Sequence, residues 1–421
     1  MRQNHKNLLR LNAYAESLAT SLGHADRRGP CLDYVQGLLL PGERKSMEPM
    51  ASRLDARKTS SKHQSLQQFI TDSPWDERRL LDAARAYALP AMSLCGGLSA
   101  WVIDDTGIPK KGIHSVGVGR QYCDVLGKQD NCQVAVSVSL ANERMGLPVA
   151  WRLYLPESWA NNPSRRKKSK VPKEVIFRRK WEIALDEIDY LLAAQVPRAP
   201  VLADAGYGMI TEFRNGLTER GLTYAVGVQP DQGVELALEE SPSRWRIKPA
   251  NGSAHALAEA LPSSAWHMIT WREGTRGDQT SRFAAVRVRQ THRVKIKEPI
   301  RPTEWLIIEW PNSATNPTKY ALATLPADID LKELIRRWKL RWRIERDYED
   351  LKGELGLDHF EGRSWRGFHH HGALCFAAYA FVAAERVRGF SPSRAAFLPE
   401  KTINPAVRPR GSPARPHRPR T

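Results

Sequence analysis

The order of strand-like and helical segments between residues 100 and 228 limits the fold of this chain more than any other feature. Three short apolar runs of strand length come first: "AWVID", "QVAVSVSLA" and "LPVAWRLYLPE". A segment with helical periodicity at 175–195 follows, and then a buried strand "APVLADAGYG", a helix "TEFRNGLTERG" and a strand "TYAVGVQ". Runs of this kind, interleaved with helical periods, are typical of an α/β domain built on a mixed sheet.

The segments after residue 228 extend this pattern. Residues 231–318 carry strand-like runs, such as "FAAVRVRQTHRV" and "EWLIIEWP", among scattered Trp, Gly and Pro, which predicts an inserted, mostly β subdomain. "KYALATLP" then returns as a strand, and "DLKELIRRWKLRWRIERDYEDLKGELG" predicts one long helix that ends near Gly353 or Gly356. The complete order is that of a ribonuclease H-like mixed sheet with helices on both faces.

The two ends of the chain differ from this middle part. The segments before residue 95 have helical periodicity, and "TDSPWDERRLL" offers Ser73 as a helix cap with Pro74 at the first helical position. From about residue 390, Pro, Arg and Ser dominate and aromatic residues disappear, which is typical of a disordered tail. The expected organisation is a helical domain at 1–95, a catalytic domain in two parts at 96–230 and 319–388, a β-rich insertion at 231–318 and a basic tail at 389–421.

The charge of the chain points to a polyanionic partner. Lysine and arginine outnumber the acidic residues by 64 to 46, which gives a net charge of +18 and a pI near 9.8. Such an excess favours nucleic-acid binding through counterion release. "RRKKSK" at 165–170, in a predicted loop, and the basic tail are each expected either to contact phosphates or to carry solvated loop charge, with equal weight.

Several other classes of protein are disfavoured. No run approaches the roughly 18 apolar residues that span a bilayer, and the first segment lacks the apolar core of a secretory signal, so a cytoplasmic location is expected. None of the five cysteines forms a C-x-x-C pair, which favours reduced, buried thiols over disulfides or zinc. For "HHH" at 369–371, a structural or DNA-facing role is favoured over a metal site.

Three acidic residues stand out by position. Asp105 closes the first strand, Asp204 closes the fourth and Glu345 lies within the long predicted helix. Carboxylates at the ends of neighbouring central strands lie close together, and their mutual repulsion calls for a cation. Mg²⁺ prefers carboxylate oxygens, and two such ions stabilise the attacking and leaving oxygens of a phosphodiester displacement. Asp104 leaves the choice of the first acid open, because adjacent strand residues face opposite sides.

The segment "WKLRWRIERDYEDLK" at 338–352 places further groups beside the third acid. On one continuous helix, Trp338, Arg341, Glu345 and Lys352 are spaced by 3, 4 and 7 residues. At about 100° per residue they fall within roughly 60° of one another. The acid would then hold the ion, the two bases would bind DNA phosphates and the Trp would stack on a base. Ordinary intrahelical ion pairs and a packed Trp would explain each residue singly.

This spacing resembles the Y-(2)-R-(3)-E-(6)-K signature of bacterial insertion-sequence transposases of the DDE type, in the insertion-sequence-four supergroup. The segments "DDTGIPKKGIHSVGVGRQYC", "LADAGYG" and "LKGELGLDHFEGRSWRGFHHH" are similar to the branch named after insertion sequence seven-hundred-one. The resemblance covers about residues 30–385. It implies Asp105, Asp204 and Glu345 as the catalytic, metal-binding triad, with Asp105 preferred because the first acid of the family directly precedes Thr.

The resemblance also assigns the neighbouring residues. Arg341 and Lys352 would contact phosphates of the DNA ends. Trp338 stands where the family has Tyr, which keeps an aromatic ring and removes a hydroxyl.

The implied activity is that of a DNA transposase. It would cut element ends at terminal inverted repeats, leave a 3′-OH and join it to target DNA, with two Mg²⁺ ions, or Mn²⁺ in their place. The helical N-terminal domain would recognise the repeats, and a homodimer would hold two ends at the bacterial nucleoid. Two hypotheses stand beside this one: a decayed, inactive copy that acts as a DNA-binding regulator, and a ribonuclease H-like nuclease with another cellular role.

Overall fold

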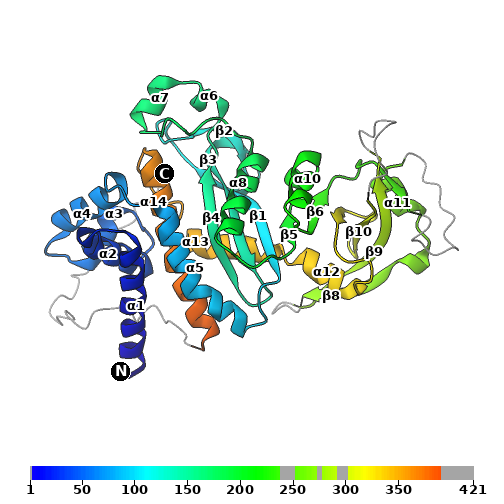
Figure 1. The fold of residues 1–421 in the computed structure, drawn as a ribbon, viewed down its shortest axis with the longest axis horizontal. Coiled ribbons are helices and arrows are strands. Elements are labelled where there is room, and N and C mark those ends of the chain that lie inside the picture. The colour runs from blue at the N-terminus through cyan, green and yellow to red at the C-terminus, as the bar shows by residue number, and fades with distance from the viewer. Residues whose placement is uncertain (1, 238–251, 273–276, 292–301, 390–421) are drawn as a thin grey trace, which may run out of the picture.

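The computed structural model describes residues 2–237, 252–272, 277–291 and 302–389. A group of helices, a central sheet and a β-rich lobe follow one another along the long axis of the molecule (Figure 1). Apart from residue 389, the predicted basic tail lies outside the described residues. No helix in the described ranges is both long and apolar enough to cross a membrane.

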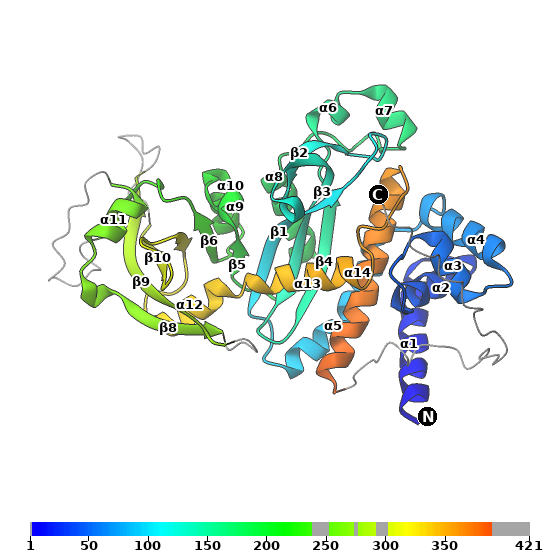
Figure 2. The same ribbon diagram turned by 180° about the vertical axis from the view of Figure 1, so that it is seen from behind.

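The predicted N-terminal helices are present, but the predicted cap is wrong. Asp76, rather than Ser73, caps the fifth helix, and its carboxylate accepts a hydrogen bond from the backbone N–H of Arg78 at 2.9 Å. This helix leaves the N-terminal group and packs along the last helix of the chain, beside the sheet (Figure 2). The helices are α1 (Arg2–Ser21), η1 (Ala25–Arg27), α2 (Arg28–Leu39), α3 (Met47–Leu54), α4 (Thr59–Thr71) and α5 (Glu77–Leu94).

The central strands have the predicted ribonuclease H-like arrangement. Their spatial order is β4–β3–β1–β5–β6, in which β3 pairs antiparallel with β1 and β4, and β5 pairs parallel with β1 and β6. The short strand β2 forms a hairpin with the start of β3. The strands are β1 (Ala100–Pro109), β2 (Gly119–Cys123), β3 (Lys128–Ala141), β4 (Gly146–Leu153), β5 (Val201–Ala203) and β6 (Tyr224–Val228).

The helices between these strands differ from the prediction at one place. Residues 165–170 were expected in a loop, yet a short helix covers most of them, because Asn162 accepts a hydrogen bond from the N–H of Arg165 and Pro163 starts the helix. The helix predicted at 175–195 is present in a shorter form. The elements are η2 (Asp124–Leu126), α6 (Glu157–Ala160), α7 (Pro163–Lys168), α8 (Lys180–Ala193), α9 (Ala205–Gly208) and α10 (Thr211–Glu219).

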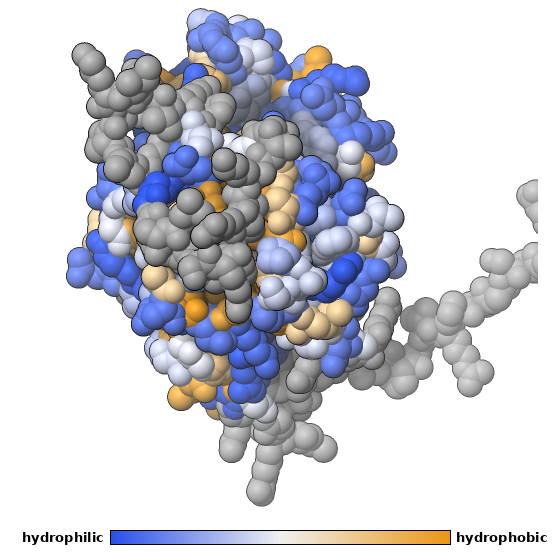
Figure 3. All heavy atoms as spheres, turned by 90° about the vertical axis from the view of Figure 1, so that its right-hand side faces the viewer, coloured by the Kyte–Doolittle hydropathy of each residue, from blue (hydrophilic) through white to orange (hydrophobic). Residues whose placement is uncertain are grey.

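The β-rich lobe continues the central sheet instead of forming a separate one. Strand β11 pairs with β6 on one side and with β10 on the other, so a single sheet, of eleven strands in the described ranges, runs through both parts. Seen from its end, the lobe shows a mixture of hydrophilic and hydrophobic side chains (Figure 3). Its elements are β7 (Val234–Leu236), α11 (Ala254–Ala260), η4 (Ser263–Ala265), β8 (His267–Arg272), β9 (Gln279–Gln290), β10 (Glu304–Pro311) and β11 (Lys319–Ala323).

The long helix predicted over residues 330–356 is two helices, so this prediction is wrong. Helix α12 (Leu331–Lys339) packs on the β-rich lobe, and α13 (Trp342–Gly353) packs on β1, β3 and β4. The N–H of Leu340 is shared between the carbonyls of Arg336 and Arg337, at 3.1 and 3.2 Å, which tightens the last turn of α12. The predicted end of the helix near Gly353 is confirmed. The last helix, α14 (Trp365–Val387), is almost wholly buried.

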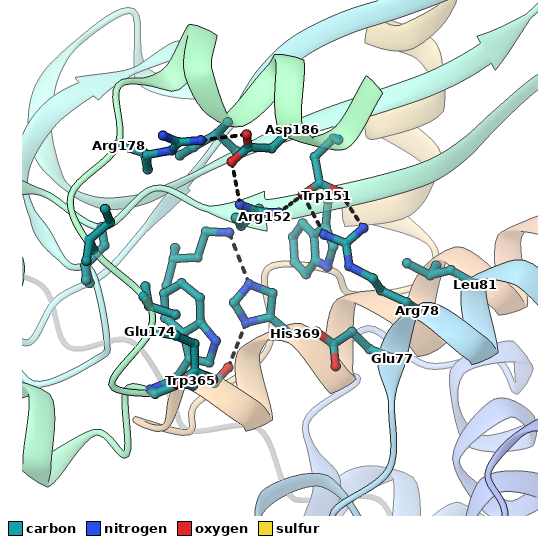
Figure 4. Close-up of a pocket in the computed structure, with 17 residues that line it drawn as sticks. Glu77, Arg78, Leu81, Trp151, Arg152, Glu174, Arg178, Asp186, Trp365 and His369 are labelled. Atoms are coloured by element: carbon teal, nitrogen blue, oxygen red, sulfur yellow. Dashed lines mark hydrogen bonds and ion pairs between the residues drawn. The ribbon is translucent and has the colours of Figure 1, made fainter. Parts of the chain in front are cut away.

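A buried ion network joins α5 to the sheet (Figure 4). The carboxylate of Glu187 in α8 is fully buried and pairs with Arg78 of α5, at 2.8 and 3.0 Å, and with Arg152 of β4, at 2.7 Å. Asp186 pairs with Arg152 at 3.1 Å and with Arg178 at 2.7 Å. These groups line a cavity of about 520 Å³. Because a buried carboxylate needs its partners, this network fixes α5 against α8 and β4.

Candidate active site

The two acids at the end of β1 lie on opposite faces of the sheet. Across the antiparallel ladders, Asp104 lines up with Ser137 and then Trp151, whereas Asp105 lines up with Val136 and Arg152. Residues aligned in this way share a face. Ser137 accepts a hydrogen bond from Tyr348 of α13, and Arg152 pairs with Asp186 of α8.

Asp104 therefore faces α13, and Asp105 faces α8. The carboxylate of Asp105 accepts a hydrogen bond from Lys180 Nζ at 2.6 Å, at the start of α8, and another from the Tyr207 hydroxyl. Burial raises the pKa of Asp105, and the charge of Lys180 opposes that rise. The negative charge of Asp105 is thus already balanced by Lys180.

Asp204 lies directly after β5, as predicted from the sequence. Its carboxylate caps the short helix α9 and accepts a hydrogen bond from the N–H of Tyr207 at 3.3 Å. In the parallel pairing of β1 with β5, Val102 lies opposite Leu202. The pairing ends there, and the negative charge of Asp204 raises the pKa of both Asp104 and Asp105, so Asp204 lies within electrostatic range of both. Asp204 borders one cavity of about 550 Å³ together with Asp105, and another of about 670 Å³ together with Glu345.

Glu345 lies in the first turn of α13, with 63% of its side chain exposed. Arg341, which precedes this helix, lies between the two acids: its guanidinium is 3.3 Å from Asp104 Oδ2 and 3.3 Å from Glu345 Oε1. Burial raises the pKa of Asp104 to about 7; Arg341 opposes this rise, and the negative charges of Asp204 and Asp105 add to it. One cation therefore holds together acids that repel one another.

The donor chemistry of this cluster suits a hard divalent cation. Asp104, Asp204 and Glu345 supply only carboxylate oxygens, the ligands that Mg²⁺ and Mn²⁺ prefer. Within the part of the chain that the structure describes, no three acidic, His or Cys side chains already converge as a metal site. Arg341 contacts Asp104 Oδ2 and Glu345 Oε1, so metal ions bound to these oxygens would compete with its guanidinium.

The residues predicted to bind DNA are divided by the break between α12 and α13. Trp338 is 8% exposed, packs edge-on against Phe283 and lines the larger cavity, so little of its ring is open for stacking. Lys352, near the end of α13, donates a hydrogen bond to the carbonyl of Gly107 in β1 at 3.0 Å, and burial lowers its pKa. The prediction that Trp338 lies on the same face of one helix as Glu345 and Lys352 is therefore wrong, because α13 begins only after Arg341.

Three groups near the acids were not anticipated from the sequence. Lys180 and Tyr207 both bind Asp105, and the guanidinium of Arg272 lies 3.8 Å from the ring centroid of Trp342 at the border of the larger cavity. Lys180 follows Asp105 by 75 residues, so no local spacing links the two. The one available signal was a basic run at the start of a predicted helix, "RRKW".

The histidine run and the cysteines have structural roles, as expected. His369 hydrogen-bonds through Nδ1 to the carbonyl of Trp365 at 2.9 Å, and its Nε2 accepts from the N–H of Leu153 at 3.2 Å. His370 and His371 are also buried and contact backbone carbonyls. All five cysteines are free and buried.

Comparison with known proteins identifies the family. A model of the DDE superfamily endonucleases matches residues 17–278, which is more than half of the chain. The chain belongs to the DDE superfamily endonucleases. A second model, described as a transposase DDE domain, matches residues 184–381.

A curated relative agrees with this DDE assignment. The chain is 27% identical over 302 residues to the probable transposase for insertion sequence element IS701 from Microchaete diplosiphon, covering 70% of this chain and 68% of the relative. A cryo-EM structure of the piggyBac transposase synaptic complex with hairpin DNA is similar with a TM-score of 0.42 and 9% identity, over 92% of this chain and 69% of that one. The DDE endonuclease described here is an IS701-like DNA transposase, an enzyme that depends on a divalent metal and binds DNA.

Proposed function

We propose that this transposase cuts element ends at terminal inverted repeats and joins the resulting 3′-OH to target DNA, with Asp104, Asp204 and Glu345 as its metal-binding acids. The observation that carries the proposal is the position of Arg341 between Asp104 and Glu345, at a cavity that Asp204 also lines. The sequence favoured Asp105 for the first position. We prefer Asp104 because it faces α13 and Glu345, whereas Asp105 faces α8 and is paired with Lys180.

The chain's own groups would have distinct tasks in this reaction. Bound to the three acids, two Mg²⁺ ions would activate the attacking water or 3′-hydroxyl and stabilise the leaving oxygen. Arg341, released from the carboxylates, would bind a phosphate close to the cut. Lys352, held against β1, would bind a second phosphate further along the strand. Trp338, which the sequence assigned to base stacking, would support this site by packing.

The remaining parts of the chain would bind and join DNA ends. The helical part at 1–95 would recognise the repeats, and the β-rich part at 231–318 would cover the cutting site from the lobe side. Two ends have to be held together for transposition, so we infer a homodimer on DNA at the bacterial nucleoid. The net charge of +18 supports extended contact with DNA.

Cleavage of the flanking repeats tests this function. A duplex that carries the inverted repeat found beside the gene is incubated with the full chain and Mg²⁺, and 3′-OH ends are detected by polymerase extension. We expect cleavage by the parent and none by Glu345→Ala. Glu349→Ala is the matched control, because Glu349 is an exposed acid of the same helix, 71% accessible. Equal cleavage by Glu345→Ala and the parent would falsify the site, and repeat binding without any cleavage would favour the regulator.

A further inference from the structure

A basic hollow lies apart from the acids, where three distant segments of the chain meet. Its volume is about 430 Å³. Residues 44–46 come from the connection between α2 and α3, residues 110–115 follow β1, and residues 358–363 connect α13 to α14. The hollow thus joins the N-terminal helices to the sheet that carries the acids.

Hydrogen bonds hold these three segments in place. Lys110 Nζ donates to the carbonyl of Phe360 at 2.7 Å, and the N–H of Lys45 donates to His359 Nδ1 at 3.0 Å. The amide of Asn131, in β3, donates to the carbonyls of Lys110 and Gly112 at 2.6 and 2.9 Å. The walls are therefore formed before any partner binds, which reduces the entropy lost on binding.

The hollow carries an excess of positive charge that the protein leaves unpaired. Two acids, Asp358 and Glu361, face four Lys or Arg side chains and two histidines, and Glu361 is paired with Arg44 at 3.2 Å. Lys111 and Arg363 are exposed, and neither has an ion-pair partner among the described residues. The basic side chains are Arg44, Lys110, Lys111, His114, His359 and Arg363. Free cations on a rigid wall are suited to an anion that arrives from outside.

The hollow also lies in line with the proposed cutting site. Helix α13 crosses the sheet from the β-rich lobe toward α14 (Figure 2). It carries Glu345 in its first turn and Lys352 in its last turn. Lys352 is bonded to Gly107, so α13 and β1 run together from the acids to the loop that follows β1. From Asp104 to Lys110, six residues of strand cover roughly 20 Å. One DNA strand advances about 3.4 Å per nucleotide, so this length matches roughly six nucleotides.

We propose that this hollow binds the phosphate backbone of the duplex arm that leaves the cutting site, about six nucleotides from the cut, with Lys111 and Arg363 as the two main contacts. The proposal rests on the proposed function, because it takes the cut DNA as the anion. Phosphate contacts of this kind fix the register of the duplex without reading its sequence. The N-terminal helices, through Arg44, would meet the same arm.

Salt-dependent DNA binding tests the hollow. The affinity of the full chain for a fluorescent duplex that carries the flanking repeat is measured from about 0.05 to 0.3 M salt, in Ca²⁺ to prevent cutting. We expect Lys111→Ala/Arg363→Ala to weaken binding on the order of tenfold at about 0.1 M salt and to reduce the slope of log K against log salt by about 2. Lys332→Ala/Arg198→Ala, which removes the same charge from exposed positions elsewhere, is the control and should change neither quantity as much.

Shortening the duplex locates the contact. The duplex is shortened so that one arm ends about six base pairs from the cut. This should weaken DNA binding by the parent but should have little further effect on DNA binding by Lys111→Ala/Arg363→Ala. The proposal for the hollow would be overturned if the losses from shortening the duplex and from the double substitution were additive. It would also be overturned if the double variant bound as tightly as the control variant. Both outcomes assume that the parent still cuts the repeat. If the parent neither binds nor cuts the repeat, the proposed function itself is rejected. Equal thermal unfolding midpoints of all variants show that these surface changes leave the fold intact.

Discussion

Asp104 and Asp105 are adjacent in β1, yet they are bound to cations on opposite faces of the sheet. Arg341 contacts Asp104 on the face of α13, and Lys180 contacts Asp105 on the face of α8. A transposase needs its acids on one face, so only one of the two can join Glu345. The other would serve to hold Lys180 and Tyr207.

Substitution of each acid separates these roles. We expect Asp104→Asn to abolish cleavage, by at least about 10³-fold, because it removes a proposed metal ligand. Asp105→Asn keeps the shape of the side chain and an oxygen that accepts from Tyr207, so it should lower the rate by about tenfold or less. End cleavage in Mg²⁺ measures both. If Asp105→Asn were inactive and Asp104→Asn active, Asp105 would be the first metal-binding acid instead of Asp104.

Arg341 should stabilise the acids when no metal is bound. In Arg341→Ala the carboxylates of Asp104 and Glu345 lose the cation between them, so we expect the thermal unfolding midpoint in EDTA to fall by roughly 2 °C. Added Mg²⁺ should recover most of this loss, because an ion that binds the folded state stabilises it. Arg346→Ala, at an exposed position within α13, is the control. An equal loss with and without Mg²⁺ would contradict the exchange of Arg341 for metal.

The sequence predicts the order of the strands in the sheet, but it does not predict the local geometry of the site. The strand order follows from apolar runs of strand length, and these runs are visible because β1, β3, β5 and β6 are buried. The break at Leu340 has no such signal: neither Gly nor Pro lies there, and the helix ends because its two halves pack on different parts of the protein. The sequence also does not show which helix covers the face of the sheet that carries Asp104. That is set by packing between segments more than 200 residues apart.

The buried network at Glu187 should contribute much more to stability than a surface pair on the same helix. Glu187→Gln leaves Arg78 without its counter-charge and Arg152 with Asp186 alone, so we expect the free energy of unfolding to fall by about 3 kcal/mol. Asp189→Asn removes the pair with Arg220, whose acid is 51% exposed, and should lower it by less than about 1 kcal/mol. Urea unfolding measures both values. Similar values for the two variants would show that the network at α5 and α8 is not a structural link.

Two glycines of neighbouring helices should respond to alanine in opposite directions. A Cβ at Gly372 of α14 would lie 1.5 Å from Cζ2 of Trp151, so Gly372→Ala should destabilise the fold by about 1–3 kcal/mol. Gly353, at the end of α13, has open space around it, so Gly353→Ala should be neutral or stabilise by up to about 1 kcal/mol. Thermal unfolding compares the two. Tolerance of Gly372→Ala would mean that α14 can move away from β4.

Acidification should destabilise the protein through His369. Its neutral ring donates to Trp365 and accepts from the N–H of Leu153, and burial lowers its pKa to about 4. Because the folded pKa lies below the unfolded value of about 6.5, the stabilisation is complete above pH 6.5 and is lost as the pH falls toward 4. Between pH 7.5 and 5.5 this histidine should account for a loss on the order of 1 kcal/mol. Urea unfolding of the parent and of His369→Gln at both pH values measures it. The variant should be less stable at pH 7.5 but should lose on the order of 1 kcal/mol less on acidification. An unchanged pH dependence would show that His369 does not titrate on unfolding.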